Sequence, residues 1–163
     1  MNGHRSQPFD YESYRRACAS FATGITVTTL IGKDGSPQGL TANSFSSISW
    51  DPPLVMVCVD VRASVHEHFL ECKAFAINIL ADDQREESAL FSTPGVDRFS
   101  GTEWEPGELG VPVLRGALGV LECTMHQAVP AGDHTIFLGE VKRAASREGR
   151  PLLYFNSSYR DLA

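Results

Sequence analysis

The sequence lacks the common signatures of nucleotide and metal sites. It contains no G-x-G-x-x-G and no G-x-x-x-x-G-K-[ST] segment, which excludes the Rossmann and P-loop modes of nucleotide binding. Its four cysteines form no C-x-x-C pair and stand in apolar or patterned stretches, which predicts buried thiols rather than a disulfide framework or a zinc site. No Gly-x-Ser-x-Gly elbow is present, and no paired carboxylates stand out within a loop.

Histidine offers no better metal site. His66 and His68 are two residues apart on an expected helix, so the two side chains do not share a face. Cys123 and His126 would point to opposite faces of a strand, and with His134 they would still lack a fourth ligand. We therefore expect no metal.

Basic residues are few and scattered. The chain has 14 Lys and Arg against 20 Asp and Glu, a net charge of −6, which argues against nucleic acid as a partner. No apolar run reaches membrane-spanning length, and no leader-like apolar segment precedes a small-residue cleavage site. These absences predict a soluble, cytoplasmic protein with no membrane partner. The 163 residues, 42% of them hydrophobic, suit one domain over residues 1–163.

Short β-branched runs dominate the pattern. An N-terminal helix is expected over about 9–23, with Asp10 as N-cap, a Phe9–Tyr14 staple, and Tyr14, Ala17, Cys18 and Phe21 on one face. Two short helices are expected from Ser64, where Glu67 completes a capping box, and over 83–91, where Glu86 plays the same part. Strands are expected over 25–31, 38–42, 54–59, 74–80, 117–127, 134–143 and 152–155.

The order of these elements indicates a mainly β fold. Six or seven strands, mostly joined as hairpins, predict an antiparallel barrel decorated by short peripheral helices, with the barrel over about 25–156. The nearly continuous apolar run 54–59 predicts a strand covered on both faces. Residues 92–113 show no periodicity and gather Gly, Pro and charge, as functional or mobile loops do.

Three stretches carry polar chemistry. The Thr-, Asn- and Ser-rich stretch within 39–53 could meet the polar edge of a heteroaromatic ring and a phosphate, or it could be a turn that satisfies its own backbone. Arg62-Ala63-Ser64 could hold an anion at a helix start or be an ordinary cap. Gly132-Asp133-His134 could aim an imidazole at a cleft or be a plain tight turn.

Five ordered motifs favour the functional interpretation, because together they resemble the short flavin reductases, the reductase components of two-component monooxygenases. The motifs are Thr23-Gly-Ile-Thr-Val27, Gly39-Leu-Thr-Ala-Asn-Ser-Phe45, Ser47-Ile-Ser49 with Asp51-Pro-Pro53, Phe75-Ala-Ile-Asn-Ile-Leu80 and Gly132-Asp-His134. The resemblance runs from about Phe21 to Leu162, although residues 100–110 match no family pattern. It implies the FMN-binding split barrel, a six-stranded antiparallel Greek-key barrel that forms a homodimer with flavin near the subunit interface.

The resemblance also implies an activity: hydride transfer from NADH or NADPH to FAD or FMN, which supplies reduced flavin to a partner monooxygenase. The alternative is a non-catalytic flavin- or haem-binding protein on the same barrel. By resemblance, residues 41–44 and Ser47 line the flavin ring and ribityl chain, Cys58–Ser64 hold the ring edge and phosphate, and Gly132–His134 meet the nicotinamide dinucleotide. Arg98 is expected at the flavin phosphates and Tyr159 beside the nicotinamide. The implied site, with His134 as its catalytic residue, is Thr41, Ala42, Asn43, Ser44, Ser47, Cys58, Val59, Asp60, Arg62, Ala63, Ser64, Arg98, Gly132, Asp133, His134 and Tyr159.

Overall fold

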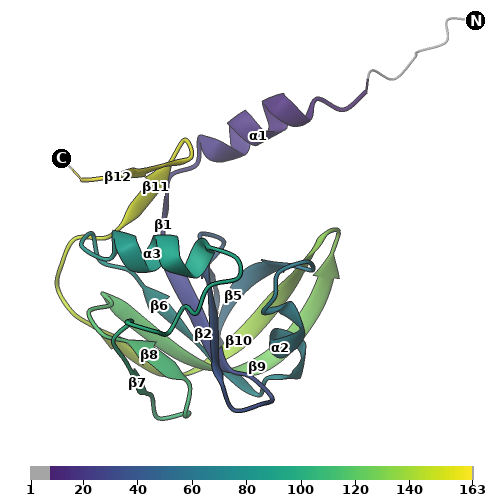
Figure 1. Ribbon diagram of the computed structural model, residues 1–163. Coiled ribbons are helices and arrows are strands. Elements are labelled where there is room, and N and C mark those ends of the chain that lie inside the picture. The colour runs from purple at the N-terminus through teal and green to yellow at the C-terminus, as the bar shows by residue number, and fades with distance from the viewer. Residues whose placement is uncertain (1–7, 163) are drawn as a thin grey trace, which may run out of the picture.

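Antiparallel strands dominate the regular secondary structure of the computed structural model, which describes residues 8–162. Within this range the helices are α1 (Tyr11–Ala19), α2 (His66–Glu71) and α3 (Arg85–Ser92). The strands are β1 (Thr23–Gly24), β2 (Thr26–Ile31), β3 (Pro37–Ala42), β4 (Ser46–Trp50), β5 (Pro53–Asp60), β6 (Ala74–Ile79), β7 (Trp104–Pro106), β8 (Pro112–Leu114), β9 (Gly119–Ala131), β10 (His134–Ser146), β11 (Leu153–Phe155) and β12 (Ser158–Arg160). The expected mainly β architecture with short helices is confirmed (Figure 1).

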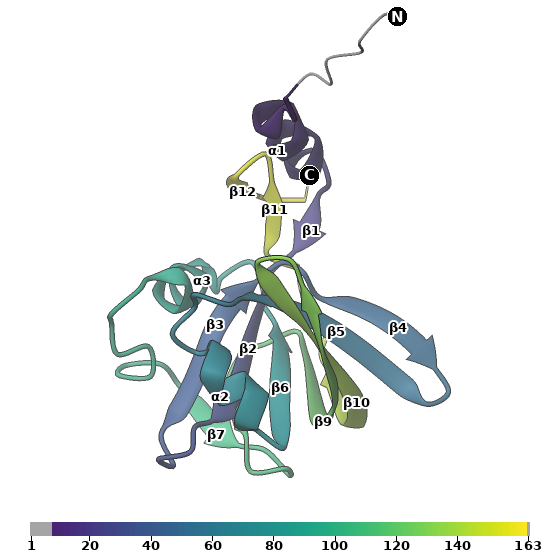
Figure 2. The ribbon, with the colours of Figure 1, turned by 90° about the vertical axis from the view of Figure 1, so that its right-hand side faces the viewer.

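The main sheet has the strand order β3-β2-β6-β9-β10-β5-β4, and every pairing within it is antiparallel. β3 and β4 follow one another in the chain yet form opposite edges of this sheet. The four residue steps from Ala42 to Ser46 span at most about 14 Å, so the sheet must curl until its edges approach at that point. We call this gap, crossed by Asn43–Phe45, the seam. The edges diverge away from it, where the β4–β5 hairpin projects from the barrel (Figure 2).

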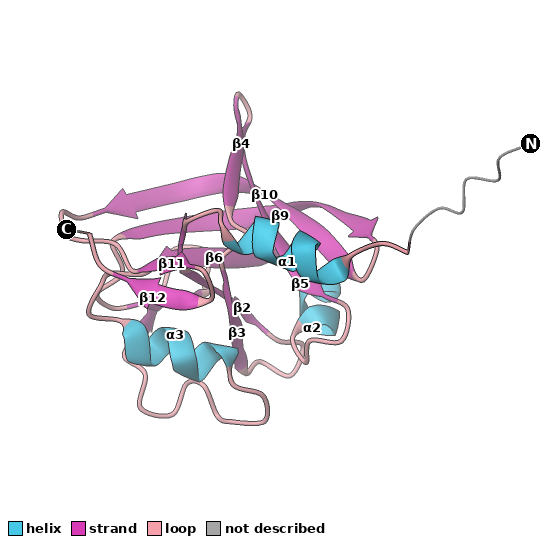
Figure 3. Ribbon diagram, turned by 90° about the horizontal axis from the view of Figure 1, so that it is seen from above, coloured by secondary structure: helices cyan, strands magenta, loops and turns pink. Residues whose placement is uncertain are grey.

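Two apolar clusters fill the interior. Phe69 of α2 packs against Phe75 and Phe137 with ring centroids 6.0 and 5.0 Å apart, which seats α2 over the barrel interior. A second cluster around Phe91 fixes α3 to the other side of β2 and β3, where it joins Leu114 of β8. Both helices therefore cover the barrel rather than extend the sheet (Figures 1 and 3).

Helix α1 begins as the sequence predicts. Asp10 accepts hydrogen bonds from the backbone N–H groups of Glu12 (3.1 Å) and Ser13 (3.0 Å), and the Phe9 and Tyr14 rings lie 5.7 Å apart. No residue of α1 is buried, so the face that carries Tyr14, Ala17 and Cys18 is not covered by the barrel. The helix stands clear of the barrel, next to β11 and β12 (Figures 1 and 2).

The predicted capping boxes of the other two helices are wrong. α2 begins at His66 rather than Ser64, α3 begins at Arg85 rather than Asp83, and neither has a side-chain cap. Before α3, Gln84 turns inward instead, accepting from the backbone N–H of Ala81 (3.1 Å) and donating to the carbonyl of Arg115 (2.9 Å). The side chain before α3 thus links the helix start to the segment before β9 instead of capping the helix.

The stretch 92–113, expected to lack structure, contains β7 and the start of β8. Asn78, fully buried on β6, donates to the Val27 carbonyl (3.0 Å) and accepts from the Leu114 N–H (2.9 Å). Thr29 of β2 donates to the Pro112 carbonyl. These bonds hold the β7–β8 hairpin firmly against the sheet.

Two burial predictions need correction. Cys123 is buried, Cys58 and Cys72 are half-buried, but Cys18 on α1 is exposed, so the chain does not bury all four thiols. β5 buries Val55, Val57 and Val59, while the alternate residues of its other face are only half-buried. Among the described residues, none of the helices has the length and apolar character needed to cross a membrane.

Candidate functional site

The seam leaves part of one strand without a strand partner. β4 pairs with β5 only as far as Met56. The backbone of Cys58, two residues further along β5, bonds to a side chain instead of to a strand. Ser44 Oγ accepts from the Cys58 N–H (2.9 Å) and donates to the Cys58 carbonyl (3.2 Å). Because backbone groups of a strand alternate between its edges, the N–H of Asp60 points to the same edge as that of Cys58. The end of β5 therefore offers a backbone donor beyond the Ser44–Cys58 contact. Asn43, next to Ser44 in the chain, is exposed, whereas Ser47 pairs with Val55 further back along β5.

The Gly132–His134 turn lies at the same end of β5, on the opposite edge of that strand. His134 pairs with Asp60 across the β5–β10 ladder, and Gly132 adopts the positive φ (66°) that the turn needs. His134 Nδ1 lies 2.8 Å from the Asp133 carboxylate, and this hydrogen bond holds the pKa of Asp133 below its usual range. With its proton on Nδ1, the imidazole presents Nε2 as an acceptor from a side chain that is 42% exposed.

Arg62 is bound to a neighbouring carboxylate. Its Nε and Nη2 donate to Asp60 at 3.1 and 2.8 Å, and its backbone N–H donates to the same carboxylate at 2.8 Å. These bonds hold the pKa of Asp60 well below its usual range. The positive charge of Arg62 is thus already balanced, which weakens its expected part in binding phosphate.

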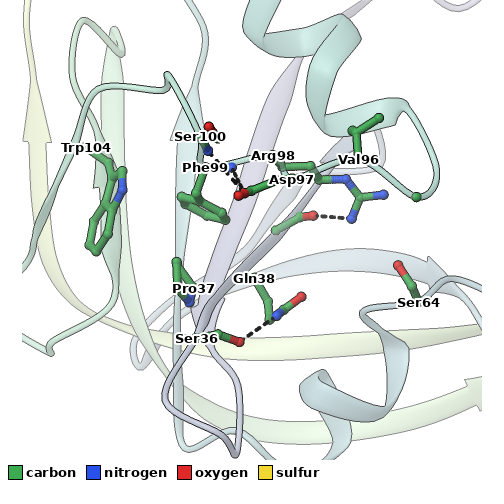
Figure 4. Close-up of a pocket in the computed structure, with 12 residues that line it drawn as sticks. Ser36, Pro37, Gln38, Ser64, Val96, Asp97, Arg98, Phe99, Ser100 and Trp104 are labelled. Carbon is green, nitrogen blue, oxygen red and sulfur yellow. Dashed lines mark hydrogen bonds between the residues drawn. The ribbon is translucent and has the colours of Figure 1, made fainter.

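A large cavity of about 620 Å³ lies between β3, the start of α2 and the loop after α3 (Figure 4). Ser64 and Arg98, both predicted to meet the flavin phosphates, line it together. Ser64 lies two residues before α2 and does not cap it, so its hydroxyl is available to the cavity. The anion site expected at this helix start stays a prediction. The cavity also takes in Gln38, Phe99 and Trp104.

Arg98 is the cation of this cavity. Its Nη1 and Nη2 donate to the carbonyls of Gly39 (2.9 Å) and Thr93 (3.1 Å), while its Nε is buried without a hydrogen-bond partner. Burial lowers the pKa of this guanidinium, which nevertheless stays charged at neutral pH. Its neighbour Asp97 accepts from the backbone N–H groups of Phe99 and Ser100, and within residues 8–162 Arg98 forms no salt bridge.

A smaller cavity of about 170 Å³ is lined by other residues of the predicted site. Thr41, Asn43 and Tyr159 line it together, although Tyr159 comes from the C-terminal strand β12. Ser88 of α3 fixes two of them: its carbonyl accepts from Thr41 Oγ1 (2.6 Å), and its hydroxyl accepts from Tyr159 (3.0 Å).

The predicted residues thus fall into neighbouring groups rather than one pocket. Ala42 and Val59 are buried in the core and Ala63 packs against it, so these three can offer a ligand little beyond backbone. Trp104, Phe99 and Gln38 were missed by sequence reasoning. The one available signal was an aromatic pair standing alone in a Gly- and Pro-rich stretch. Residues 8–162 contain no cluster of three metal-ligating side chains.

Comparison with known proteins connects this geometry to a family. Residues 18–163 match the family described as flavin reductase like domain. The chain belongs to the flavin reductase family. The match includes residues 100–110, which the sequence motifs left unplaced.

Named relatives and solved structures agree. The chain is 44% identical to the FMN reductase (NADH) SmoA of Agrobacterium fabrum, covering 90% of this chain and 83% of that one. It is 41% identical to the reductase component of the flavin-dependent trigonelline monooxygenase of Acinetobacter baylyi, covering 89% of this chain but only 47% of the relative. The NADH:FAD oxidoreductase of Streptomyces globisporus, solved with NAD and FAD fragments, superposes with a TM-score of 0.89 at 38% identity over 94% of this chain and 93% of that one. The split-barrel prediction is therefore confirmed.

Proposed function

We propose that this protein oxidises NADH and reduces a flavin, and that it delivers the reduced flavin to a separate monooxygenase. The names of the relatives support each part: they include NADH-dependent reductases of FAD and FMN, and the reductase component of a two-component monooxygenase. The structural observation that carries the proposal is the unpaired end of β5, which lies between a polar segment and an imidazole-bearing turn.

The seam fits the polar edge of a flavin ring. A flavin carries carbonyl and ring nitrogen acceptors on one edge, and the free N–H of Asp60 with the amide of Asn43 supplies matching donors. Neutral donors of this kind stabilise the negative charge that develops on reduction without holding the product permanently. Ser44 keeps the end of β5 in place through its two bonds to Cys58.

His134 fits the nicotinamide carboxamide. Asp133 fixes the ring through Nδ1, so Nε2 can accept from the carboxamide N–H group. This contact would orient the nicotinamide against the flavin at about 3–3.5 Å, the separation that direct transfer requires.

Hydride transfer between the two rings requires few other protein groups. When bound, the flavin accepts the hydride that the nicotinamide supplies. The chain has only to position both rings and exclude water. This is consistent with the carboxylates near the seam, Asp60 and Asp133, whose pKa values hydrogen bonds hold below their usual range, so that neither serves as a proton donor.

The test is steady-state NADH oxidation with FAD, FMN and riboflavin supplied separately, and with NADPH in a parallel series. The proposal requires flavin-dependent oxidation that saturates in both substrates. Flavin binding without NADH oxidation would instead support the non-catalytic flavin-binding alternative. A cytoplasmic location stays a prediction of the sequence.

We also propose a homodimer in which a second copy covers the outer face of β5 and β10. On this face Cys58 pairs with Ile136 and Met56 pairs with Leu138, and all four side chains are only half-buried. A strand with such an apolar sequence is expected to be covered on both faces. The exposed apolar side chains of Phe9, Tyr11, Tyr14 and Phe21, on or beside α1, add a second uncovered surface.

A further inference from the structure

The large cavity extends beyond Ser64 and Arg98, the two residues expected to bind phosphate. Figure 4 shows Ser64 at one end, Arg98 between, and Trp104 at the far end. At about 620 Å³ it lies within the range of small-molecule sites. If the flavin ring occupies the seam and its phosphate meets Arg98, the part of the cavity near Trp104 has room for a further group.

The middle of the cavity suits an anion. Arg98 is half-buried, it forms no salt bridge within residues 8–162, and both of its terminal nitrogens already donate to backbone carbonyls. A half-buried guanidinium without a carboxylate partner gains from a phosphate, which can accept charge-assisted hydrogen bonds from the second N–H of each terminal nitrogen. Its unpartnered Nε is a donor still to be satisfied. Asp97 is the one carboxylate among the lining residues, and two backbone N–H groups occupy it.

The far end suits a flat aromatic group. Trp104 is half-buried, and its ring is held edge-to-face against Phe99 at 5.8 Å with an 80° interplanar angle. Phe99 in turn packs edge-to-face on Phe91 of α3 at 5.1 Å. The indole is therefore fixed before any ligand arrives, as a stacking surface for a nucleobase should be.

Polar side chains lie between the two ends. Ser36 and Gln38 line the cavity from β3 and the turn before it, and Gln38 Nε2 donates to Ser36 Oγ at 2.8 Å. This leaves the amide oxygen of Gln38 as an acceptor for a sugar hydroxyl.

We propose that this cavity binds the adenosine 5′-phosphate half of FAD, with the phosphate at Arg98 and Ser64 and the adenine on Trp104. The inference rests on the proposed flavin reductase function and deepens it, because it makes FAD the preferred flavin over FMN. Trp104 is the residue that distinguishes the two, since FMN has no group to reach it.

Equilibrium titrations with FAD and FMN test this on the wild-type protein and on Trp104→Ala. Wild-type protein should bind FAD at least about tenfold more tightly than FMN, as base stacking on an aromatic ring would give. Trp104→Ala should remove most of that difference while the FMN affinity stays the same. Trp104→Phe, which keeps an aromatic ring, should restore part of it. Equal affinities in the wild-type protein, or equal losses for both flavins in Trp104→Ala, would overturn the proposal.

A direct probe avoids any loss of packing. The chain has two tryptophans, and Trp50 is 96% exposed on β4, so Trp50→Phe leaves Trp104 as the sole indole. Adenosine 5′-monophosphate should quench the fluorescence of this variant and leave that of Trp104→Phe unchanged. Quenching in neither variant, or in both alike, contradicts the assignment.

NADH also carries an adenosine 5′-phosphate, so a further experiment distinguishes binding of NADH in this cavity from binding of FAD. Binding of NADH and of reduced nicotinamide mononucleotide is compared in the wild-type protein and in Trp104→Ala. If the variant weakens NADH but not FAD, the cavity serves the hydride donor and the proposal is wrong. If neither flavin binds the wild-type protein, the proposed function itself fails; tight but equal binding of FAD and FMN defeats only the present inference.

Discussion

At the seam, single side chains make contacts that strand pairing does not provide. Ser44 replaces a missing strand partner of Cys58, and Asp133 fixes the ring of His134. These contacts assign separate tasks to the polar segment and the turn, so substitutions in each should affect different ligands.

His134→Ala should raise the KM for NADH by roughly three- to tenfold, the worth of one neutral hydrogen bond. The flavin dissociation constant should stay close to that of the wild-type protein, because the seam donors are intact. Steady-state kinetics together with flavin titration measure the two effects. Equal weakening of NADH and flavin would remove His134 from its assigned place.

Asn43→Ala should show the opposite pattern. Loss of its amide should weaken flavin binding by a similar factor and leave the KM for NADH nearly unchanged at saturating flavin. A flavin titration curve identical to that of the wild-type protein would show that the seam does not hold the ring. His134→Ala serves as the matched control.

The cysteines differ in reactivity. Burial raises the pKa of Cys72 to about 11 and that of Cys123 to about 12, so both stay protonated and unreactive at pH 8. Exposed Cys18 should react rapidly with a thiol reagent at that pH, and Cys18→Ser should remove one fast equivalent. Cys72 and Cys123 should react only after unfolding; fast labelling of either in the native protein would contradict their burial.

At the scale of elements, the sequence predicts the elements whose pattern is local. Asp10 and the Phe9–Tyr14 pair mark the start of α1, and β-branched runs mark β2 and β6. It missed β4, whose serines resemble a turn, because that strand depends on pairing with β5. It missed the β7–β8 hairpin for the same reason: Asn78 and Thr29, distant in sequence, hold it in place.

Close packing in the core leaves no room for a side chain at Gly139 of β10. A Cβ there would lie 2.4 Å from the Phe75 ring and 2.7 Å from Cys123 Cβ, so Gly139→Ala overpacks the core. We expect a loss of about 1–3 kcal/mol in the free energy of unfolding, measured by chemical denaturation. Gly24→Ala is the matched control, since a Cβ at Gly24 meets nothing within 4 Å. Equal stabilities of the two variants would contradict the packing described.

For the whole molecule, the dimer proposal accounts for the half-covered outer face of β5. Leu138→Glu places a charge on that face and should shift the protein toward monomer in sedimentation velocity experiments. Leu70→Glu is the matched control, because Leu70 is an exposed leucine on α2, away from the proposed interface. A wild-type protein that sediments as a monomer would contradict the proposal outright.

The candidate site was predictable in part at this scale. Motif resemblance located the polar segment, the β5 end and the turn, and the curled sheet brings these together. The residue that distinguishes FAD from FMN in our proposal, Trp104, could not be found by that route. Its place depends on a hairpin whose position is decided by tertiary hydrogen bonds rather than by local pattern.

The central claim is that this chain brings a nicotinamide and a flavin together for direct hydride transfer, and anaerobic single-turnover mixing measures that step. The protein with bound flavin is mixed with NADH in the absence of oxygen, and the visible absorbance of oxidised flavin is followed. The account predicts bleaching at a rate that saturates with NADH and greatly exceeds that of free flavin. Bound flavin that stays oxidised in the presence of saturating NADH would contradict it.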